Sequence, residues 1–102
     1  MKQIEIIELR SSGRNNDLLK KELSRMMNEI ANTNDLQDVS IDLYKNQIIP
    51  TDFSIHLAHE SGRVDSTGTQ LGLHICSALK PFGLINHKLW IEMNTKSSIH
   101  NN

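Results

Sequence analysis

Residues 53–60 read FSIHLAHE, and apolar side chains alternate with polar or small ones almost throughout. Because side chains of a β-strand point to opposite faces in turn, this pattern predicts a strand with one apolar face. That face carries Phe53, Ile55 and Leu57. The opposite face carries Ser54, His56, Ala58 and Glu60. Such a strand packs against a core on one side only.

Two other segments, residues 38–45 and 85–93, alternate in the same way. Their apolar faces are Val39, Ile41 and Leu43, and Leu89, Ile91 and Met93. Their other faces are Ser40, Asp42 and Tyr44, and Lys88, Trp90 and Glu92. Both segments therefore predict half-buried strands.

Residues 3–10 predict a fourth strand, but its two faces are both apolar. Ile4 and Ile6 lie on one face, and Ile7 and Leu9 lie on the other. The period of two therefore predicts the strand without deciding which of its faces meets the core.

Two amphipathic helices separate these strands. Their apolar residues recur at the spacing of one helical face. The stripes are Leu19, Leu23, Met26, Met27 and Ile30, and Leu71, Ile75, Ala78, Leu79 and Phe82. The expected N-caps are Asn15, Asn16 or Asp17 for the first helix and Ser66 or Thr67 for the second, after a loop at residues 61–66. Pro81 and Gly83 are expected to end the second helix.

The predicted order βαββαβ belongs to the α+β class. Two such halves pack most simply as a four-stranded antiparallel sheet with both helices on one face, which is the ferredoxin-like arrangement. Its usual strand order, 4-1-3-2, places the first and third strands in the centre. Residues 1–93 would form this single domain, and residues 94–102 a polar, flexible tail.

The face of the sheet without helices is expected to mix apolar and ionisable groups. We assign Glu5, Ile7 and Leu9 of the first strand to it. An exposed Ile7 and Leu9 beside Trp90 would make an adhesive patch on a monomer, and a second copy of the chain would cover it. We therefore expect a homodimer that pairs through the open sheet face.

Composition excludes several other partners. Lys plus Arg number 11 and Asp plus Glu number 12, so no basic surface for nucleic acid is expected. The apolar runs are too short for a membrane span. The chain has one cysteine, which excludes an intramolecular disulfide and suits a reducing compartment. A soluble, cytoplasmic protein is the expectation.

In element order and face pattern, residues 3–93 resemble the dimeric α/β-barrel superfamily. This superfamily includes the antibiotic-biosynthesis-monooxygenase-like proteins and small stress-response proteins. The resemblance implies two ferredoxin-like sheets that face each other around a cavity. Its members include cofactor-independent oxygenases, isomerases, haem-degrading enzymes and proteins without known activity. The haem-degrading members resemble one another through a set of an Asn, a Trp and a His. Trp90 lies on the last predicted strand and has no matching helical histidine, so this set is not reproduced here. No cofactor is expected.

The candidate site lies on the open face. His56 and Glu60 are the candidate catalytic pair, because an imidazole beside an acid can move protons near neutral pH. The candidate ligand-binding residues are Tyr44, Trp90, Lys88 and Asp42. A small aromatic or quinone-like ligand would fit a cleft lined by these residues. The same residues would be equally typical of a sheet face exposed to solvent or of a polar dimer interface.

No metal site is expected, although His56 and Glu60 with a third ligand from a partner chain remain an alternative. His59 points to the opposite face from His56, which excludes the helical zinc motif. His87 shares the parity of Leu89 and is expected to border the core. Cys76 flanks the helical stripe and is expected to be a small buried apolar group.

Three functions follow from these observations. The chain could be a small-molecule enzyme of the monooxygenase or isomerase type, a dimer that binds or senses a ligand without chemistry, or a homodimeric scaffold whose open face is only an interface. Whether it is an enzyme is left open by the sequence.

Overall fold

The computed structural model describes residues 2–32, 39–60 and 67–93. The predicted tail at 94–102 and the predicted loop at 61–66 lie outside this range. The elements are β1 (Gln3–Ser11), α1 (Asn16–Ala31), β2 (Val39–Lys45), β3 (Asp52–His59), α2 (Gln70–Leu79), the short 3-10 helix η1 (Lys80–Phe82) and β4 (Gly83–Ile91). The predicted order βαββαβ is confirmed.

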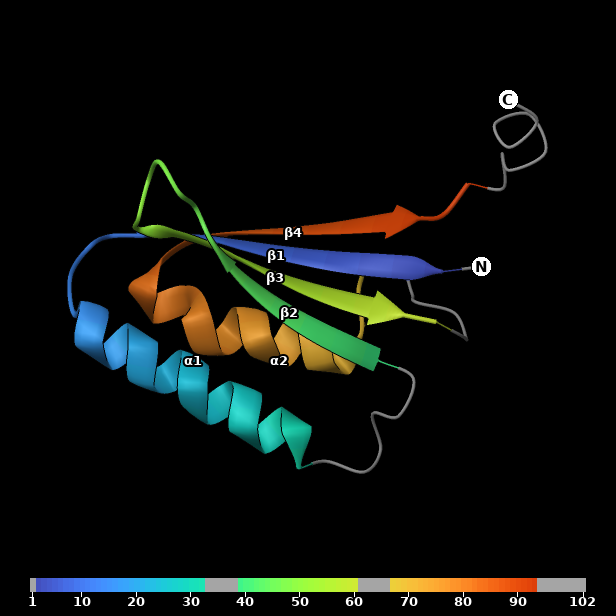
Figure 1. Ribbon diagram of the computed structural model, residues 1–102, viewed down its shortest axis with the longest axis horizontal. Helices are drawn as coiled ribbons and strands as arrows, with labels where there is room; N and C mark the ends of the chain where they lie inside the picture. Colours follow the sequence, from blue (N-terminus) through green and yellow to red (C-terminus); the bar gives the residue numbers. More distant parts are fainter. Residues whose placement is uncertain (1, 33–38, 61–66, 94–102) are drawn as a thin grey trace.

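The strands form one antiparallel sheet in the order β2-β3-β1-β4. Both helices cover the same face of this sheet, and the other face carries no helix (Figure 1). The predicted ferredoxin-like fold, with the first and third strands in the centre, is therefore confirmed. Neither helix in the described part of the chain is long and apolar enough to cross a membrane.

The core lies between the sheet and the two helices. Ile55 and Leu57 of β3 are buried there, as the alternation of residues 53–60 predicts. The helices contribute the buried residues Leu19, Leu23, Met26, Ile75 and Leu79.

The assignment of β1's faces was wrong. Ile7 and Leu9 belong to the core, and the Glu5 side chain is fully buried there with an exposed fraction of 0%. Ile7 lies between Ile55 and His87 in the register, so it shares the helix-covered face with its neighbours. The open face instead receives the alternate residues of β1, which are Ile4, Ile6, Glu8 and Arg10.

The ends of the helices depend on local residues. Thr69, one position before α2, accepts a hydrogen bond from the Gly72 amide at 3.0 Å, so it is the N-cap instead of Thr67. Ser66 lies outside the described residues. Asn15 precedes α1 with a left-handed backbone (φ 55°) and makes no side-chain cap hydrogen bond. Pro81 lies in η1 and Gly83 begins β4, so the predicted end of the helix near these residues is confirmed.

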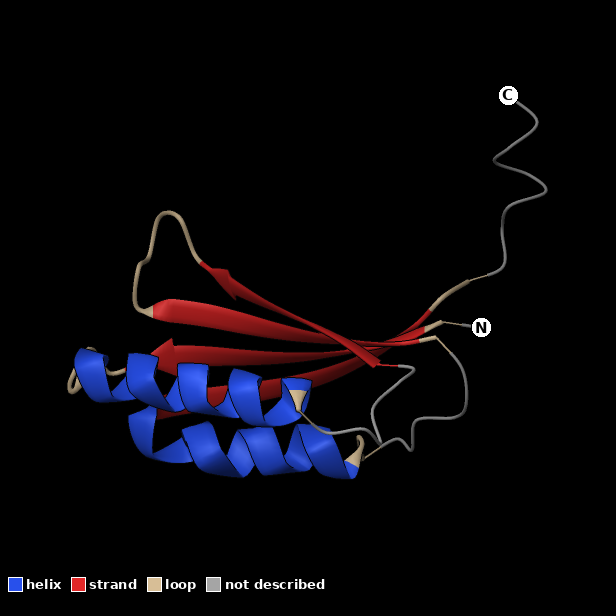
Figure 2. Cartoon of the chain, turned by 60° about the horizontal axis from the view of Figure 1, so that its bottom comes forward, coloured by secondary structure: helices blue, strands red, loops and turns tan. Residues whose placement is uncertain are grey.

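The turn between β2 and β3, residues 46–51, rises from the sheet on the side away from the helices (Figures 1 and 2). The Asn46 side chain shapes it, because its Oδ1 accepts hydrogen bonds from the amides of Ile48 at 2.8 Å and Ile49 at 2.9 Å. Asp52 closes the turn by donating its amide to the Ile49 carbonyl at 3.0 Å. The turn therefore forms a wall at one end of the open face.

Candidate functional site

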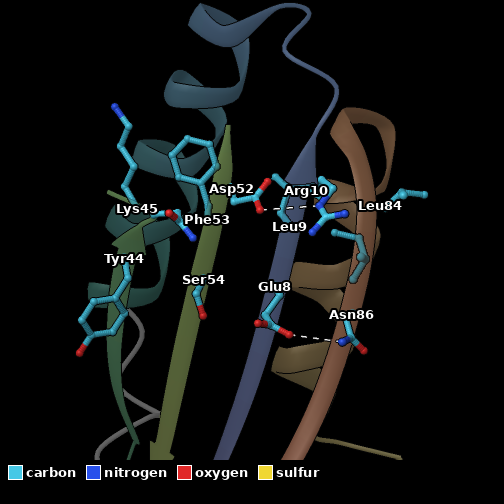
Figure 3. Close-up of a pocket in the computed structure, with 12 residues that line it drawn as sticks. Glu8, Leu9, Arg10, Tyr44, Lys45, Asp52, Phe53, Ser54, Leu84 and Asn86 are labelled. Carbon is cyan, nitrogen blue, oxygen red and sulfur yellow. Dashed lines mark hydrogen bonds and ion pairs between the residues drawn. The ribbon is translucent and has the colours of Figure 1, made fainter. Parts of the chain in front are cut away.

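The open face consists of rows of residues that run across the four strands. The register places Asp42, His56, Ile6 and Lys88 in the middle row. The next row toward the raised turn is Tyr44, Ser54, Glu8 and Asn86, which Figure 3 shows side by side on their strands. On the other side lies the row Ser40, Ala58, Ile4 and Trp90. Five of the six predicted site residues therefore lie in three adjacent rows of this face.

His56 is held by two neighbours on this face. Its Nε2 lies 2.9 Å from the Ser54 hydroxyl, and its ring packs against Tyr44 with centroids 4.5 Å apart and planes tilted by 48°. A hydrogen-bonding partner on the same strand, Ser54, and a ring contact from the neighbouring strand, Tyr44, therefore fix the imidazole ring. A partly buried imidazole in this position can accept or donate a proton at a group lying on the sheet.

A groove of about 490 Å³ lies at the end of the open face beneath the raised turn. Its lining includes the open-face residues Glu8, Arg10, Tyr44, Ser54, Leu84 and Asn86 (Figure 3). This volume is within the range of small-molecule pockets, which is roughly 300–1,000 Å³. The groove adjoins the Tyr44–His56 contact.

Charged residues surround the groove in opposite pairs. Glu8 forms an ion pair with Lys88 at 2.9 Å and accepts a hydrogen bond from Asn86 Nδ2 at 3.3 Å. Arg10 Nε lies 3.7 Å from Asp52 Oδ2, while the other carboxylate oxygen of Asp52 is buried without a hydrogen-bond partner in the described structure. The groove is therefore polar on its floor, with Tyr44 and Leu84 on its sides.

The structure does not bring the two candidate catalytic residues together. Glu60 follows the end of β3, four residues from His56, which in an extended strand is about 13 Å. Its carboxylate lies 3.6 Å from Lys2 Nζ. Trp90 is 58% exposed and lies one row beyond His56, on the side away from the groove. Tyr44, of the predicted set, is the residue that lines the groove.

A second polar cluster lies beneath the sheet, and the sequence analysis did not predict it. The buried Glu5 carboxylate accepts hydrogen bonds from His59 Nε2 and His87 Nε2, each at 2.8 Å. The Thr69 amide and hydroxyl also donate to it, at 3.2 Å and 2.5 Å. We call these four residues the Glu5 cluster. It joins β1, β3 and β4 to the start of α2.

The Glu5 cluster favours an ionised carboxylate. Burial raises the pKa of Glu5, but hydrogen bonds from the Thr69 hydroxyl, His87, the Thr69 amide and His59 together lower it below its usual value. An ionised carboxylate only accepts hydrogen bonds, so the Nε2 atoms of both histidines carry protons. The adjacent N-terminus of α2 adds a favourable dipole.

Two glycines make room for this carboxylate. A Cβ atom on Gly72 would collide with Glu5 Oε2, and one on Gly68 would collide with the His87 ring. Gly68 also has a left-handed backbone (φ +95°), which glycine adopts at little cost. Glycine at position 68, just before α2, and at position 72, in its first turn, is therefore required by the Glu5 cluster.

The remaining predictions for single residues agree with the structure. His59 and His56 point to opposite faces, and His87 borders the core as its parity predicts. Cys76 packs against the core, where burial and then the nearby Glu5 charge raise its pKa, so its thiol is poorly reactive. Within the described residues, no group of three or more His, Cys, Asp or Glu side chains is arranged to hold a metal ion.

Comparisons with known proteins identify the fold. No protein-family model and no curated protein matches this sequence. Among solved structures, Rv0793 from Mycobacterium tuberculosis is similar with a TM-score of 0.67 at 12% identity, over 92% of this chain and 97% of that one.

Two further structures are candidate antibiotic biosynthesis monooxygenases. The protein from Nitrosomonas europaea has a TM-score of 0.67 at 11% identity, over 92% of both chains. The protein from Bordetella bronchiseptica has a TM-score of 0.61 at 6% identity, over 90% of this chain and 97% of that one. The predicted resemblance is thereby confirmed at the level of architecture: this chain has the ferredoxin-like fold of the antibiotic-biosynthesis-monooxygenase-like proteins.

Proposed function

We propose that this chain is a homodimer that binds a small aromatic or quinone-like molecule in the groove on its open sheet face. The observation that carries the proposal is the groove of about 490 Å³, which adjoins the Tyr44–His56 contact. Tyr44 offers a flat apolar surface for stacking a conjugated ring. Ser54, Asn86 and Glu8 offer hydrogen-bond partners that would orient the polar groups of the ring.

His56 is the proposed acid or base of this site. Its imidazole is fixed by Ser54 and Tyr44, so it keeps a constant position relative to a ring stacked on Tyr44. It would remove a proton from a phenol or enol of the ligand and return a proton to another atom in an isomerisation. In an oxygenase-type reaction, the deprotonated phenol, O₂ and the proton returned by His56 would yield a quinone and one water molecule.

Asp42, Lys88 and Trp90 have a different proposed role from Tyr44. They lie on the open face but outside the lining of the groove. Trp90 and the partly buried Ile4 and Ile6 leave apolar area on this face, which a second copy of the chain would cover. In this account they form the dimer surface around the ligand site. Glu60 has a weaker case as a catalytic partner because of its position near Lys2.

The binding part of the proposal is tested with a panel of naphthols and hydroxynaphthoquinones. Ligand occupancy is expected to release heat in titration calorimetry and to raise the melting temperature. Tyr44→Ala should weaken both effects. Leu18→Ala, which removes an exposed apolar side chain from α1, is the matched control and should change neither. Absence of any response across the panel would contradict the proposal.

Product analysis then separates an enzyme from a ligand sensor. If the protein is an enzyme, mass spectrometry of the ligand after incubation in air should show a changed compound, and His56→Ala should abolish the change while binding persists. Unchanged ligand at full occupancy favours a sensor.

A homodimeric scaffold is the second candidate. It is favoured by the exposed apolar residues of β4, because Leu84 is 73% exposed and Trp90 is 58% exposed on the same face. In that case the groove would be filled by protein, and the dimer would form without any ligand response.

A further inference from the structure

We propose that a cleft between α1 and the edge strand β2 binds the anion of an unbranched aliphatic carboxylic acid. Its carboxylate lies between Lys20 and Lys45, and its alkyl chain lies along α1. We call this place the α1–β2 cleft. It is on the helix side of the sheet, so the inference goes beyond the open-face site and does not rest on it.

The α1–β2 cleft has a volume of about 610 Å³, which is within the range of small-molecule pockets. Its apolar lining consists of Leu23 and Met27 of α1, Leu43 of β2 and Phe53 of β3. Leu43 pairs with Ile55 in the register and so points toward the helices, yet it is 40% exposed. α1 therefore leaves part of the core side of β2 uncovered, and an apolar ligand would remove this surface from water.

Two lysines lie at one end of the cleft. α1 and β2 run in opposite directions, because α1 ends and β2 begins at the same end of the molecule (Figure 1). Lys20, in the second turn of α1, therefore lies near Lys45, the last residue of β2, and both line the cleft. In the described part of the chain, no acidic side chain forms an ion pair with either lysine. Two ammonium groups without a counterion favour an anionic head group at this end.

The acidic residues of α1 do not neutralise this end of the cleft. At 3.6 residues per turn, Glu22 and Glu29 lie on the side of α1 opposite the residues that line the cleft. Both form ion pairs with Arg25 on that side. Asp17, one turn before Lys20, is outside the lining. A carboxylate in the cleft would therefore meet positive charge without a competing acid in its lining.

The shape of the cleft fits an alkyl chain. Its lining on α1 extends from Lys20 to Asn28, which is about 12 Å at 1.5 Å per residue. Carbon–carbon bonds of about 1.5 Å advance an extended chain by about 1.25 Å per atom, so decanoate spans this distance and laurate slightly exceeds it. The chain would pass Met27, whose flexible side chain adapts to irregular apolar surfaces.

Titration calorimetry with laurate, below its critical micelle concentration, tests the inference. Heat of binding is expected, and the affinity should rise about two- to fourfold per methylene from octanoate to laurate, because each methylene removes apolar area from water. Dodecyltrimethylammonium has the same alkyl chain with a cationic head, and it should bind at least about tenfold more weakly. Equal affinity for this cation, or no heat with any of the acids, would overturn the inference.

A charge variant tests the place of the carboxylate. Lys20→Glu should weaken laurate binding at least about fivefold, since an attraction becomes a repulsion. Lys80→Glu makes the same change of charge at an exposed residue outside the cleft, and it should leave the affinity within about twofold. Equal effects of the two variants would overturn the proposed place of the head group.

A filled cleft tests the place of the alkyl chain. Ser24 is exposed and lines the cleft, so the indole of Ser24→Trp would occupy it and should abolish laurate binding. Ser77→Trp adds the same side chain at an exposed position of α2 and should leave binding unchanged. Lys45 and Phe53 border both this cleft and the open-face groove, whereas Ser24 lines only the cleft.

The open-face site is distinguished by Tyr44→Ala, which should leave laurate binding unchanged because Tyr44 lines only the open-face groove. Laurate binding that is lost in Tyr44→Ala but kept in Ser24→Trp would place the chain in the open-face groove and overturn the inference. Failure of the naphthol panel leaves this inference standing, and failure of laurate leaves the open-face proposal standing.

Discussion

Replacing Gly72 by alanine should destabilise the protein, although the same change in the middle of a helix normally stabilises by about 1 kcal/mol. The added Cβ would collide with Glu5 Oε2. Glu5 cannot move aside freely, because its carboxylate is fully buried and holds His59, His87 and Thr69 through hydrogen bonds. The expected sign is therefore opposite to that of helix propensity.

The magnitude follows from the contacts that must give way. Overpacking a tight site costs about 1–3 kcal/mol, and weakening a hydrogen bond to a charged acceptor costs about 1.5–3 kcal/mol. Allowing for the gain in helix propensity, Gly72→Ala should cost about 2–4 kcal/mol. For a chain of this size this corresponds to a melting temperature lowered by roughly 10–20 °C.

Urea unfolding followed by far-ultraviolet circular dichroism measures this cost, with all variants at one protein concentration because a dimer's stability depends on it. Ser77→Ala, at an exposed position of the same helix, is the control and should stay within about 0.5 kcal/mol of the native protein. In a Glu5→Ala background, Gly72→Ala should cost at least about 1 kcal/mol less, because the colliding carboxylate is gone. A Gly72→Ala protein as stable as the native one would refute the tight packing of the Glu5 cluster.

Other changes give further expected outcomes. The pKa of Glu5 is lowered from 4.5 in the folded state, so its contribution to stability is fully present above pH 4.5 and is lost as pH falls through the folded value. Glu5→Gln should make the free energy of unfolding less dependent on pH below 4.5. An unchanged dependence in this range would count against an ionised Glu5 in the folded protein. His87→Ala removes one donor to Glu5 and should cost about 1–3 kcal/mol by urea unfolding. Asn15→Ala should cost about 1 kcal/mol because of the left-handed backbone, while Asn15→Gly should be neutral or stabilising, and equal stabilities would refute this reason.

The fold could be predicted from the sequence because most elements have a single apolar face. Residues 53–60 alternate cleanly, and their assigned faces match the structure. β1 was misassigned because Ile6 and Ile7 are adjacent, so both of its faces are apolar. Burial of Glu5 is also unusual, since a charged residue rarely enters a core unless it is paired.

A signal for the Glu5 cluster was nevertheless present in the sequence. His59 has the parity of Leu57, and His87 has the parity of Leu89, so both histidines were predicted to point toward the core side. Two inward imidazoles need a hydrogen-bond acceptor, and Glu5 supplies it from the strand between them. The requirement of both histidines for one acceptor therefore places Glu5 on the core face, and Ile7 and Leu9 share that face by strand parity.

The candidate site was predictable only in part. Strand parity alone places Asp42, Tyr44, His56, Lys88 and Trp90 on one face. The groove, however, depends on the path of the turn at residues 46–51, which the Asn46 side chain shapes through hydrogen bonds that alternation does not encode.

Native mass spectrometry of freshly purified protein tests most directly the claim that the open face binds both a second copy and a small ligand. The account predicts a dimer, with added ligand mass after incubation with the naphthol and hydroxynaphthoquinone panel. Tyr44→Ala should lose the added mass and keep the dimer. A monomer that binds no member of the panel would contradict the account, because the open face would then have neither of its proposed partners.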